Sequence, residues 1–441
     1  MSIAQLTDQP STFSSSDEAI FSKVAWRLLP LLTLCYVVAF LDRINIGFAQ
    51  LQMQKTLAFS NEAFAFGAGV FFVGYFMFEV PSNLLLEKIG ARKTLLRIMF
   101  CWGLLASAMI YVQSPWQFYT LRFLLGVFEA GFFPGIILYL TYWFPAAKRA
   151  RMISIFMTGT AIAQLVAGPL SGATLKYMDG FLHHQGWQWL FVTQGLPATL
   201  LGVIVYVVLK DKPEDAPWLS AAEKSALRRH LDNDQHGVAA ASHDKSYKSL
   251  LRDPKIYLLA VIYFMFLGAT YGMNFWTPML IKSWGVPDVF TIGLLTTIPS
   301  AFGIVGMIWL GRSSDRRAER RWHFFVSSGL GAAGILMTIF SLGSLAWSLA
   351  GLCVMSVGKL SQTPLFFTTV SEYLPKKTAA GGIALVSSLG ALGPSVIPYL
   401  MAWITSRTGS QANGLYVVMV LYLLSGFLLL AVVRGSRSNN Q

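Results

Sequence analysis

Apolar blocks about as long as a bilayer is thick recur along the whole chain, and they constrain its fold more than any other feature. A membrane span needs roughly 20 predominantly apolar residues, and with short loops the 441 residues hold about twelve such blocks. Only 12% of the residues are charged, against about 25% in soluble domains. The sequence therefore predicts an all-α integral membrane protein in the lipid bilayer, with no room for a soluble catalytic domain.

The expected spans form two groups of six, separated by a long polar segment. We predict five regions: a cytoplasmic N-terminal tail at 1–24, a first six-helix half at 25–209, a cytoplasmic linker at 210–255, a second six-helix half at 256–433 and a cytoplasmic tail at 434–441. Within the linker, Ser220 and Glu223 have the spacing of a capping box and predict a short surface helix. The first residues are polar and contain no signal-peptide pattern, so we expect no cleaved leader.

The distribution of lysine and arginine predicts how the chain crosses the membrane. Of the 34 lysines and arginines, 27 fall in tails and loops on the side of the termini, 4 fall in the opposite loops and 3 lie within spans. By the positive-inside rule, both termini are cytoplasmic, and we expect a multi-pass protein of the cell (inner) membrane. This topology accounts for the net charge of +13, so no nucleic-acid partner is expected.

Four charged side chains fall inside two spans of the first half. Asp42 and Arg43 lie in AFLDRINIGFA with Asn45, and Arg122 and Glu129 lie in LRFLLGVFEAGFFPG. A charge at the middle of a membrane costs roughly 2.5 to 3.5 kcal/mol, so such residues usually face a bundle interior or a water-filled cavity. Seven residues of helix rise about 10 Å, so Arg122 and Glu129 are too far apart to pair with each other. We expect the four charges, with Tyr75 of the second span, to form a site rather than two separate structural ion pairs.

Lys359 is the only basic residue inside the spans of the second half. Ser361 and Gln362 follow it in SVGKLSQTP, and we expect all three to contact substrate. Two readings of Lys359 stay open, because a lone lysine can also extend along its helix to the membrane surface. If it points inward, the site suits an anion with two acceptor ends, such as a dicarboxylate or a carboxylate bearing a ring hydroxyl.

Two six-span halves joined by a cytoplasmic linker resemble the major facilitator superfamily. NLLLEKIGARK is similar to the superfamily's basic signature between the second and third helices, although Asn83 stands where Gly is usual and Ala91 where a base is usual. GRSSDRRAERR occupies the corresponding place in the second half. LDRINIGFA, FEVPSN, RFLLGVFEAGFFPG and DKPEDAPW together resemble the anion:cation symporter family, a family of organic-anion/proton symporters.

The resemblance implies roles for the intramembrane residues. The protonated acids of the family match Asp42 and Glu129, its basic site residues match Arg43 and Arg122, and a polar cavity residue matches Tyr75. The eleventh span departs from the family pattern, because Ser387 and Ala391 of ALVSSLGALGP stand where amides are common. Ser387 is nevertheless expected to line the substrate site.

The resemblance also implies that the two basic turns latch the cytoplasmic side in the outward-open state. The gating residues expected there are Glu87, Arg92, Lys93, Asp315 and Arg316.

The charge count of the first half predicts a mechanism. With both acids ionised the cluster is neutral, so an entering carboxylate adds uncompensated negative charge at a cost of several kcal/mol. Protonating Asp42 or Glu129 releases a basic partner for the substrate, which links anion binding to proton binding. We expect proton-coupled uptake of a small organic carboxylate by alternating access: an aromatic acid, a hydroxy acid or a dicarboxylate.

An anion exchanger and a transporter-like nutrient sensor are the alternatives, whereas a membrane enzyme is disfavoured. No soluble active-site domain or nucleophile supports an enzyme, and CVMSVGKL lacks the first Gly and the Ser or Thr of a phosphate-binding loop. The three cysteines lie in spans without CxxC spacing, so neither a metal nor a cofactor is expected. Nothing in the sequence demands more than a monomer.

Overall fold

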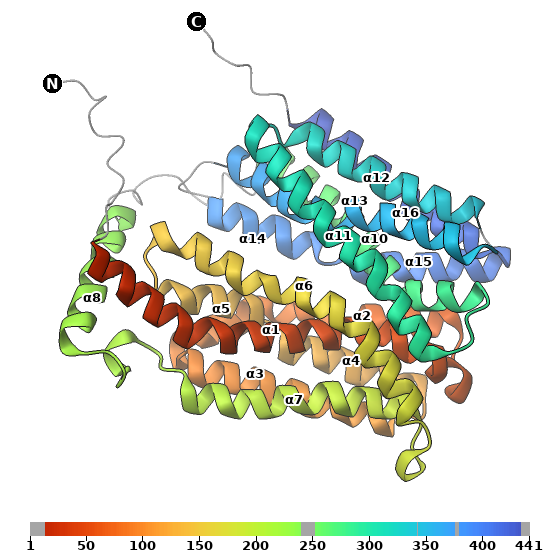
Figure 1. The fold of residues 1–441 in the computed structure, drawn as a ribbon, viewed down its shortest axis with the longest axis horizontal. Coiled ribbons are helices and arrows are strands. Elements are labelled where there is room, and N and C mark those ends of the chain that lie inside the picture. Colours follow the sequence, from red (N-terminus) through yellow and green to blue (C-terminus); the bar gives the residue numbers. More distant parts are fainter. Residues whose placement is uncertain (1–13, 240–251, 342, 375–378, 434–441) are drawn as a thin grey trace, which may run out of the picture.

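The computed structural model describes residues 14–239, 252–341, 343–374 and 379–433, and its helices form two bundles packed side by side (Figure 1). Eleven helical segments in the described chain are long and apolar enough to cross a membrane. Helix α13 (Leu345–Tyr373) completes the twelve expected spans, and it is less apolar because it carries Lys359, Ser361 and Gln362. The expected all-α membrane fold is confirmed.

The first half consists of seven helices, because its fourth span is divided in two. Its helices are α1 (Ser15–Leu57), α2 (Asn61–Ile89), α3 (Ala91–Ala108), α4 (Pro115–Glu129), α5 (Phe132–Thr141), α6 (Ala146–Tyr177) and α7 (Gly186–Val208). Single 3₁₀ turns follow α3, α6 and α7: η2 (Met109–Tyr111), η3 (Phe181–His183) and η4 (Pro213–Asp215).

The linker contributes α8 (Ala221–Ala239), and the second half again has seven helices because its eleventh span is divided. Besides α13, they are α10 (Pro254–Ser283), α11 (Val289–Arg317), α12 (Arg321–Phe340), α14 (Ala379–Gly390), α15 (Gly393–Thr408) and α16 (Gln411–Val432).

The break in the fourth span falls directly after Glu129. We expected one continuous span there, but Gly131 has a φ of +87°, a conformation that side chains other than glycine rarely adopt. A Cβ on Gly131 would also lie 2.5 Å from the Ser82 hydroxyl oxygen. Glu129 is therefore the last residue of a half-helix, and irregular backbone at membrane depth is tolerated where protein or a cavity surrounds it.

In the fifth span, the small residues and the proline of AGPLSG predict both tight packing and a helix break. The predicted break is wrong, because α6 runs through Pro169 without interruption. The close packing expected from the same small residues is confirmed. A Cβ on Gly168 would lie 2.2 Å from the Gly293 carbonyl oxygen of α11, so the two helices touch backbone to backbone.

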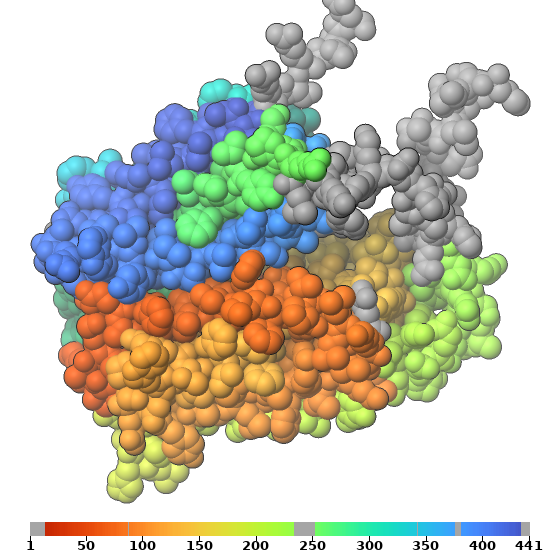
Figure 2. All heavy atoms as spheres, turned by 180° about the vertical axis from the view of Figure 1, so that it is seen from behind, coloured from red at the N-terminus to blue at the C-terminus, as the bar shows by residue number. Residues whose placement is uncertain are grey.

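The two halves meet most closely at the end of the bundle opposite α8, which we call the far end. Helix α1 packs on α10, α6 on α11, and α2 on α15, the last pair being visible from behind in Figure 2. Lys176 of α6 forms an ion pair of 2.8 Å with Asp288, which caps α11. The hydrogen bond from Lys176 lowers the pKa of Asp288 to about 2, so the pair stays ionised at neutral pH. The far end is closed in this conformation.

The beginning of α1 packs against the linker helix. Helix α1 starts at Ser15, inside the segment 1–24 that we expected to be a tail. The Lys23 ammonium lies 2.9 Å from the Glu223 carboxylate of α8. The expected capping box is confirmed, because the Ser220 amide donates to Glu223 at 2.7 Å and the Glu223 amide donates to the Ser220 hydroxyl at 3.2 Å.

Candidate functional site

Arg43 and Glu129 form an ion pair between α1 and the end of α4. The Arg43 Nε donates to Glu129 Oε1 at 2.5 Å, and the Glu129 side chain is completely buried. The Arg43 guanidinium also lies over the Tyr75 ring of α2, 5.0 Å from its centre. The expectation that Glu129 finds its partner on another helix is confirmed, and Tyr75 belongs to the same cluster.

Asp42 lies in a second cluster, inside the first half. Its carboxylate accepts a hydrogen bond from the Trp102 indole of α3 at 3.2 Å and one from Asn45 at 3.3 Å. Arg122 is the cation with the strongest electrostatic effect on Asp42, and its Nη2 lies 3.4 Å from the Ala68 carbonyl oxygen. The four charges therefore comprise one ion pair, Arg43–Glu129, which interacts with Tyr271 of the second half, and an Asp42 that interacts electrostatically with Arg122.

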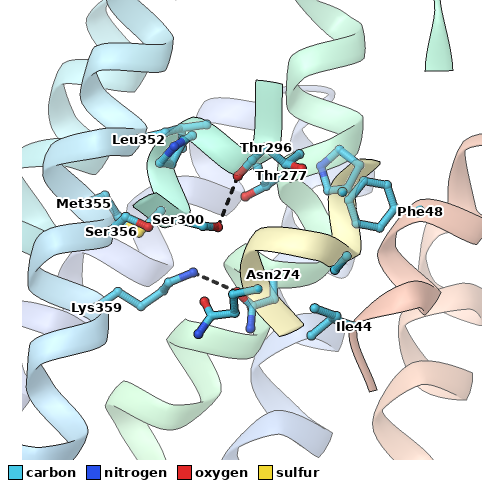
Figure 3. A pocket seen from close by; sticks show the side chains of 15 residues that line it. Ile44, Phe48, Asn274, Thr277, Thr296, Ser300, Leu352, Met355, Ser356 and Lys359 are labelled. Carbon is cyan, nitrogen blue, oxygen red and sulfur yellow. Dashed lines mark hydrogen bonds between the residues drawn. The ribbon is translucent and has the colours of Figure 1, made fainter. Parts of the chain in front are cut away.

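Lys359 points into a cavity between the halves (Figure 3). Its Nζ donates to Asn274 Oδ1 of α10 at 2.8 Å, and 7% of the residue is exposed, so the surface-directed reading is wrong. In the part of the chain that the structure describes, no carboxylate pairs with it. A buried cation without a counter-charge is unfavourable unless an anion completes the site.

The cavity has a volume of about 60 Å³ and a mixed polar and apolar wall drawn from both halves. Lys359 and Asn274 belong to the second half. The first half contributes the Gln164 amide and the apolar side chains of Ile44 and Phe48. The hydroxyls come from Thr277, Thr296, Ser300 and Ser356. Hydroxyls and amides of this kind suit an oxygen-rich ligand.

Helix α10 connects the two positive centres. Tyr271 lies close enough to Arg43 to interact with it electrostatically, and Asn274, which binds Lys359, follows one turn later. Three residues of helix rise about 4.5 Å, so Arg43 and Lys359 contact α10 at positions about one helical turn apart. Sequence reasoning missed Tyr271 and Asn274, because uncharged polar residues in an apolar span give a weak signal.

Glu79 is a third acid at the centre of the bundle, and sequence reasoning treated it only as part of a family signature. It lies one turn after Tyr75 on α2, within electrostatic reach of Arg43. The Ser388 hydroxyl of α14, in the second half, lies 3.4 Å from its carboxylate. Ser387, which we expected to line the substrate site, does not line the cavity beside Lys359, and the next residue, Ser388, joins the two halves at the level of Glu79.

Two expected substrate contacts bind groups within the second half instead. The Ser361 hydroxyl donates to the Val357 carbonyl oxygen of its own helix at 2.7 Å, and the Gln362 amide donates to the Ser328 hydroxyl of α12 at 3.0 Å. Both residues are buried, and neither lines the cavity in this conformation.

The basic turns bind within their own halves in this conformation. The Arg92 amide donates to Asp211 at 2.9 Å and its guanidinium to the Tyr206 carbonyl oxygen, while Asp315 pairs with Arg320 at 2.6 Å. The Lys93 and Arg316 side chains are exposed, and the side chain of Glu87 lies outside the described residues. Their latch role in the opposite conformation stays a prediction.

Comparison with known proteins identifies the family. The family model of the Major Facilitator Superfamily matches residues 32–398 and again 289–441. The chain belongs to the major facilitator superfamily. It is therefore a secondary transporter of metabolites, not an enzyme.

Relatives resemble the chain over almost its whole length. It is 40% identical to the metabolite transport protein NicT of Pseudomonas putida, covering 98% of each chain. A protein of Agrobacterium vitis named as a tartrate transporter is 42% identical, over 95% of this chain and 92% of its own. The inner membrane transport protein RhmT of Escherichia coli is 36% identical, over 96% of each.

Solved structures share the fold. The inward-open xylose transporter XylE from E. coli matches with a TM-score of 0.75 at 13% identity, over 95% of this chain and 98% of its own. A bacterial homologue of the human lysosomal transporter Spinster, inward-facing and occupied, matches with a TM-score of 0.73 at 15% identity, over 92% and 96%. The likeness establishes the major facilitator fold.

Proposed function

We propose that the protein is a proton-coupled symporter that imports a small organic carboxylate, as a member of the anion:cation symporter family. The observation that carries the proposal is the ion pair between Arg43 and Glu129, set across the halves from the buried Lys359. Arg43 is paired with an acid, Glu129, that a proton can neutralise. Lys359 has no acid partner among the described residues.

The balance of charge supports proton coupling. Three acids, Asp42, Glu79 and Glu129, face three bases, Arg43, Arg122 and Lys359, in this region. A carboxylate that enters alone leaves uncompensated negative charge where the dielectric constant is low.

A proton on Glu129 restores the balance and frees Arg43 to bind the carboxylate through its planar fork of donors. Glu129 Oε2 and Arg43 Nη2 have no hydrogen-bond partners among the described residues. Glu129 Oε2 is therefore available for a proton, and Arg43 Nη2 is available for a substrate oxygen.

The substrate is a carboxylate with two acceptor ends. Arg43 binds one end once Glu129 is protonated, and Lys359 with Asn274 binds the other. The hydroxyls of the cavity wall suit a hydroxylated chain between the two ends, which agrees with the relatives named as tartrate transporters.

Transport follows alternating access by movement of one half against the other. With both termini and α8 on the cytoplasmic side of the cell membrane, the closed far end is external and the structure is inward-facing. The two positive centres then lie near the middle of the bilayer, where both halves contribute.

Uptake into proteoliposomes tests the proposal. With the outside acidic, the reconstituted protein should accumulate labelled L-tartrate or succinate, and adding substrate without a gradient should acidify a pH dye in the lumen. A protonophore should abolish accumulation. Counterflow of labelled substrate without any lumenal acidification would instead identify an anion exchanger, and absence of both would indicate a sensor.

A further inference from the structure

A basin of about 610 Å³ opens at the far end, over the junction of the two halves. The loop between α6 and α7, which projects from this end in Figure 1, forms one wall and contributes His183 and His184. The ends of α1 and α10 form the others and contribute Lys55 and Lys282. These four residues define what we call the external basin.

Two of the few lysines and arginines at the far end line the external basin. Only four lysines and arginines were assigned to the external loops, Lys55, Lys176, Lys282 and Arg407, and two of them line the basin. Lys176 is neutralised by Asp288, whereas neither basin lysine has a carboxylate partner among the described residues. The one acid in the wall, Asp179, is held by the Gly186 amide at 2.8 Å. The basin is thus an anion-attracting surface on a face with few charges.

The two lysines come from different halves. Lys55 belongs to the last turn of α1, and Lys282, from the last turn of α10, reaches across to the Leu51 carbonyl oxygen at 3.0 Å. They are close enough to repel each other electrostatically. An anion between them removes that repulsion and holds the two helix ends together.

We propose that the external basin binds a small organic dianion, distinct from the central substrate site, and that the bound anion stabilises the conformation closed at the far end. Opening the far end separates α1 from α10 and dismantles the site. A ligand that binds one of two conformations shifts the equilibrium toward it, so an external dianion slows the return to the outward-facing state. The external location of the basin and its effect on the return to the outward-facing state rest on the proposed function, whereas binding of the dianion does not.

Thermal unfolding of the purified full-length protein separates this site from the central one. In an Arg43→Gln background, L-tartrate and sulfate should still raise the unfolding temperature, and acetate should do so less. Adding Lys55→Gln and Lys282→Gln should raise the half-saturating concentration by about tenfold or more, as expected for losing charge-assisted contacts. The single variant Lys55→Gln serves if the double variant does not fold, because Lys55 is exposed.

Arg407→Gln is the matched control. It removes the same charge from the same end, but Arg407 lies over the Trp403 ring of α15 and does not line the basin. This control should leave the anion response unchanged. An equal loss in Arg407→Gln, or no anion response in the Arg43→Gln background, would overturn the proposal.

A transport measurement gives a second, independent readout. External sulfate should inhibit tracer uptake by the wild-type protein, and Lys55→Gln should relieve the inhibition; inhibition that persists unchanged in this variant contradicts the site. The two proposals can fail separately. If no carboxylate is transported, but the dianions still stabilise the Arg43→Gln protein through Lys55 and Lys282, the proposed function is wrong and the anion site in the basin is supported.

Discussion

At the scale of single residues, the fold places each intramembrane acid where its proton has a different consequence. Glu129 binds Arg43 directly, so in the proposed mechanism its protonation frees Arg43 for the substrate. Asp42 accepts hydrogen bonds from Trp102 and Asn45 within the first half, so we expect its protonation to act on these contacts and on the electrostatic interaction with Arg122.

The acids should therefore differ in mutagenesis. Glu129→Gln should abolish pH-driven accumulation but keep substrate binding and exchange, because the amide mimics the protonated acid and leaves Arg43 available. Asp42→Asn should abolish accumulation as well. Uptake of labelled substrate and counterflow are measured in parallel, and full accumulation by both variants contradicts proton coupling through these residues.

Arg43 should be the principal ligand for one carboxylate. Arg43→Lys keeps the charge but loses the planar fork and its position over Tyr75, so we expect substrate affinity to fall by about tenfold or more. Binding to the purified protein checks this. Near-normal affinity in Arg43→Lys would shift the role to Arg122 or Lys359.

Lys359 should bind the second acceptor end of the substrate. Lys359→Ala should weaken binding of L-tartrate by about tenfold or more, because one charge-assisted hydrogen bond contributes roughly 1.5 to 3 kcal/mol, and it should affect acetate less. Ser361→Ala is the control on the same helix, since that hydroxyl binds only its own backbone. If Lys359→Ala behaves like Ser361→Ala, the two-ended substrate is wrong.

The charged residues could be found from the sequence because a charge in an apolar span is costly and therefore conspicuous. Their pairing could not, because which helices become neighbours depends on the packing of the whole bundle: Asp42 meets Trp102, and Arg43 meets Glu129. Asn274 gave no such signal, since an amide in a long apolar span resembles many structural amides.

At the scale of helices, glycines decide where the halves can touch. Gly168 and Gly293 let α6 and α11 meet backbone to backbone, which closes the far end beside the Lys176–Asp288 pair. The sequence predicted this close packing from small residues. It did not distinguish a continuous helix at Pro169 from a broken one after Glu129, because surrounding helices decide whether freed backbone groups find partners.

A larger side chain at this contact should hinder closure. Gly293→Val should disfavour the far-end-closed conformation by about 1 to 3 kcal/mol through overpacking, and slow uptake accordingly. Gly311→Val on the same helix is the control, because a Cβ there meets nothing within 4 Å. Uptake rates are compared at equal protein in the membrane. Equal rates for the two variants would show that the α6–α11 contact does not limit transport.

At the scale of the whole molecule, orientation connects the basic loops, the linker helix and the proposed functions of both ends. The positive-inside rule predicts that α8 lies in the cytoplasm and that the loop between α3 and α4 lies outside.

Cysteine labelling in intact cells tests this orientation. After replacement of the native cysteines Cys35, Cys101 and Cys353, a cysteine at the exposed Ala222 of α8 should react with a membrane-impermeant maleimide only after the cells are opened. A cysteine at the exposed Gln113, in the loop before α4, should react in intact cells. The reverse pattern would place α8 outside. The basic turns would then lie outside as well, and the basin between Lys55 and Lys282 would sense cytoplasmic rather than external anions.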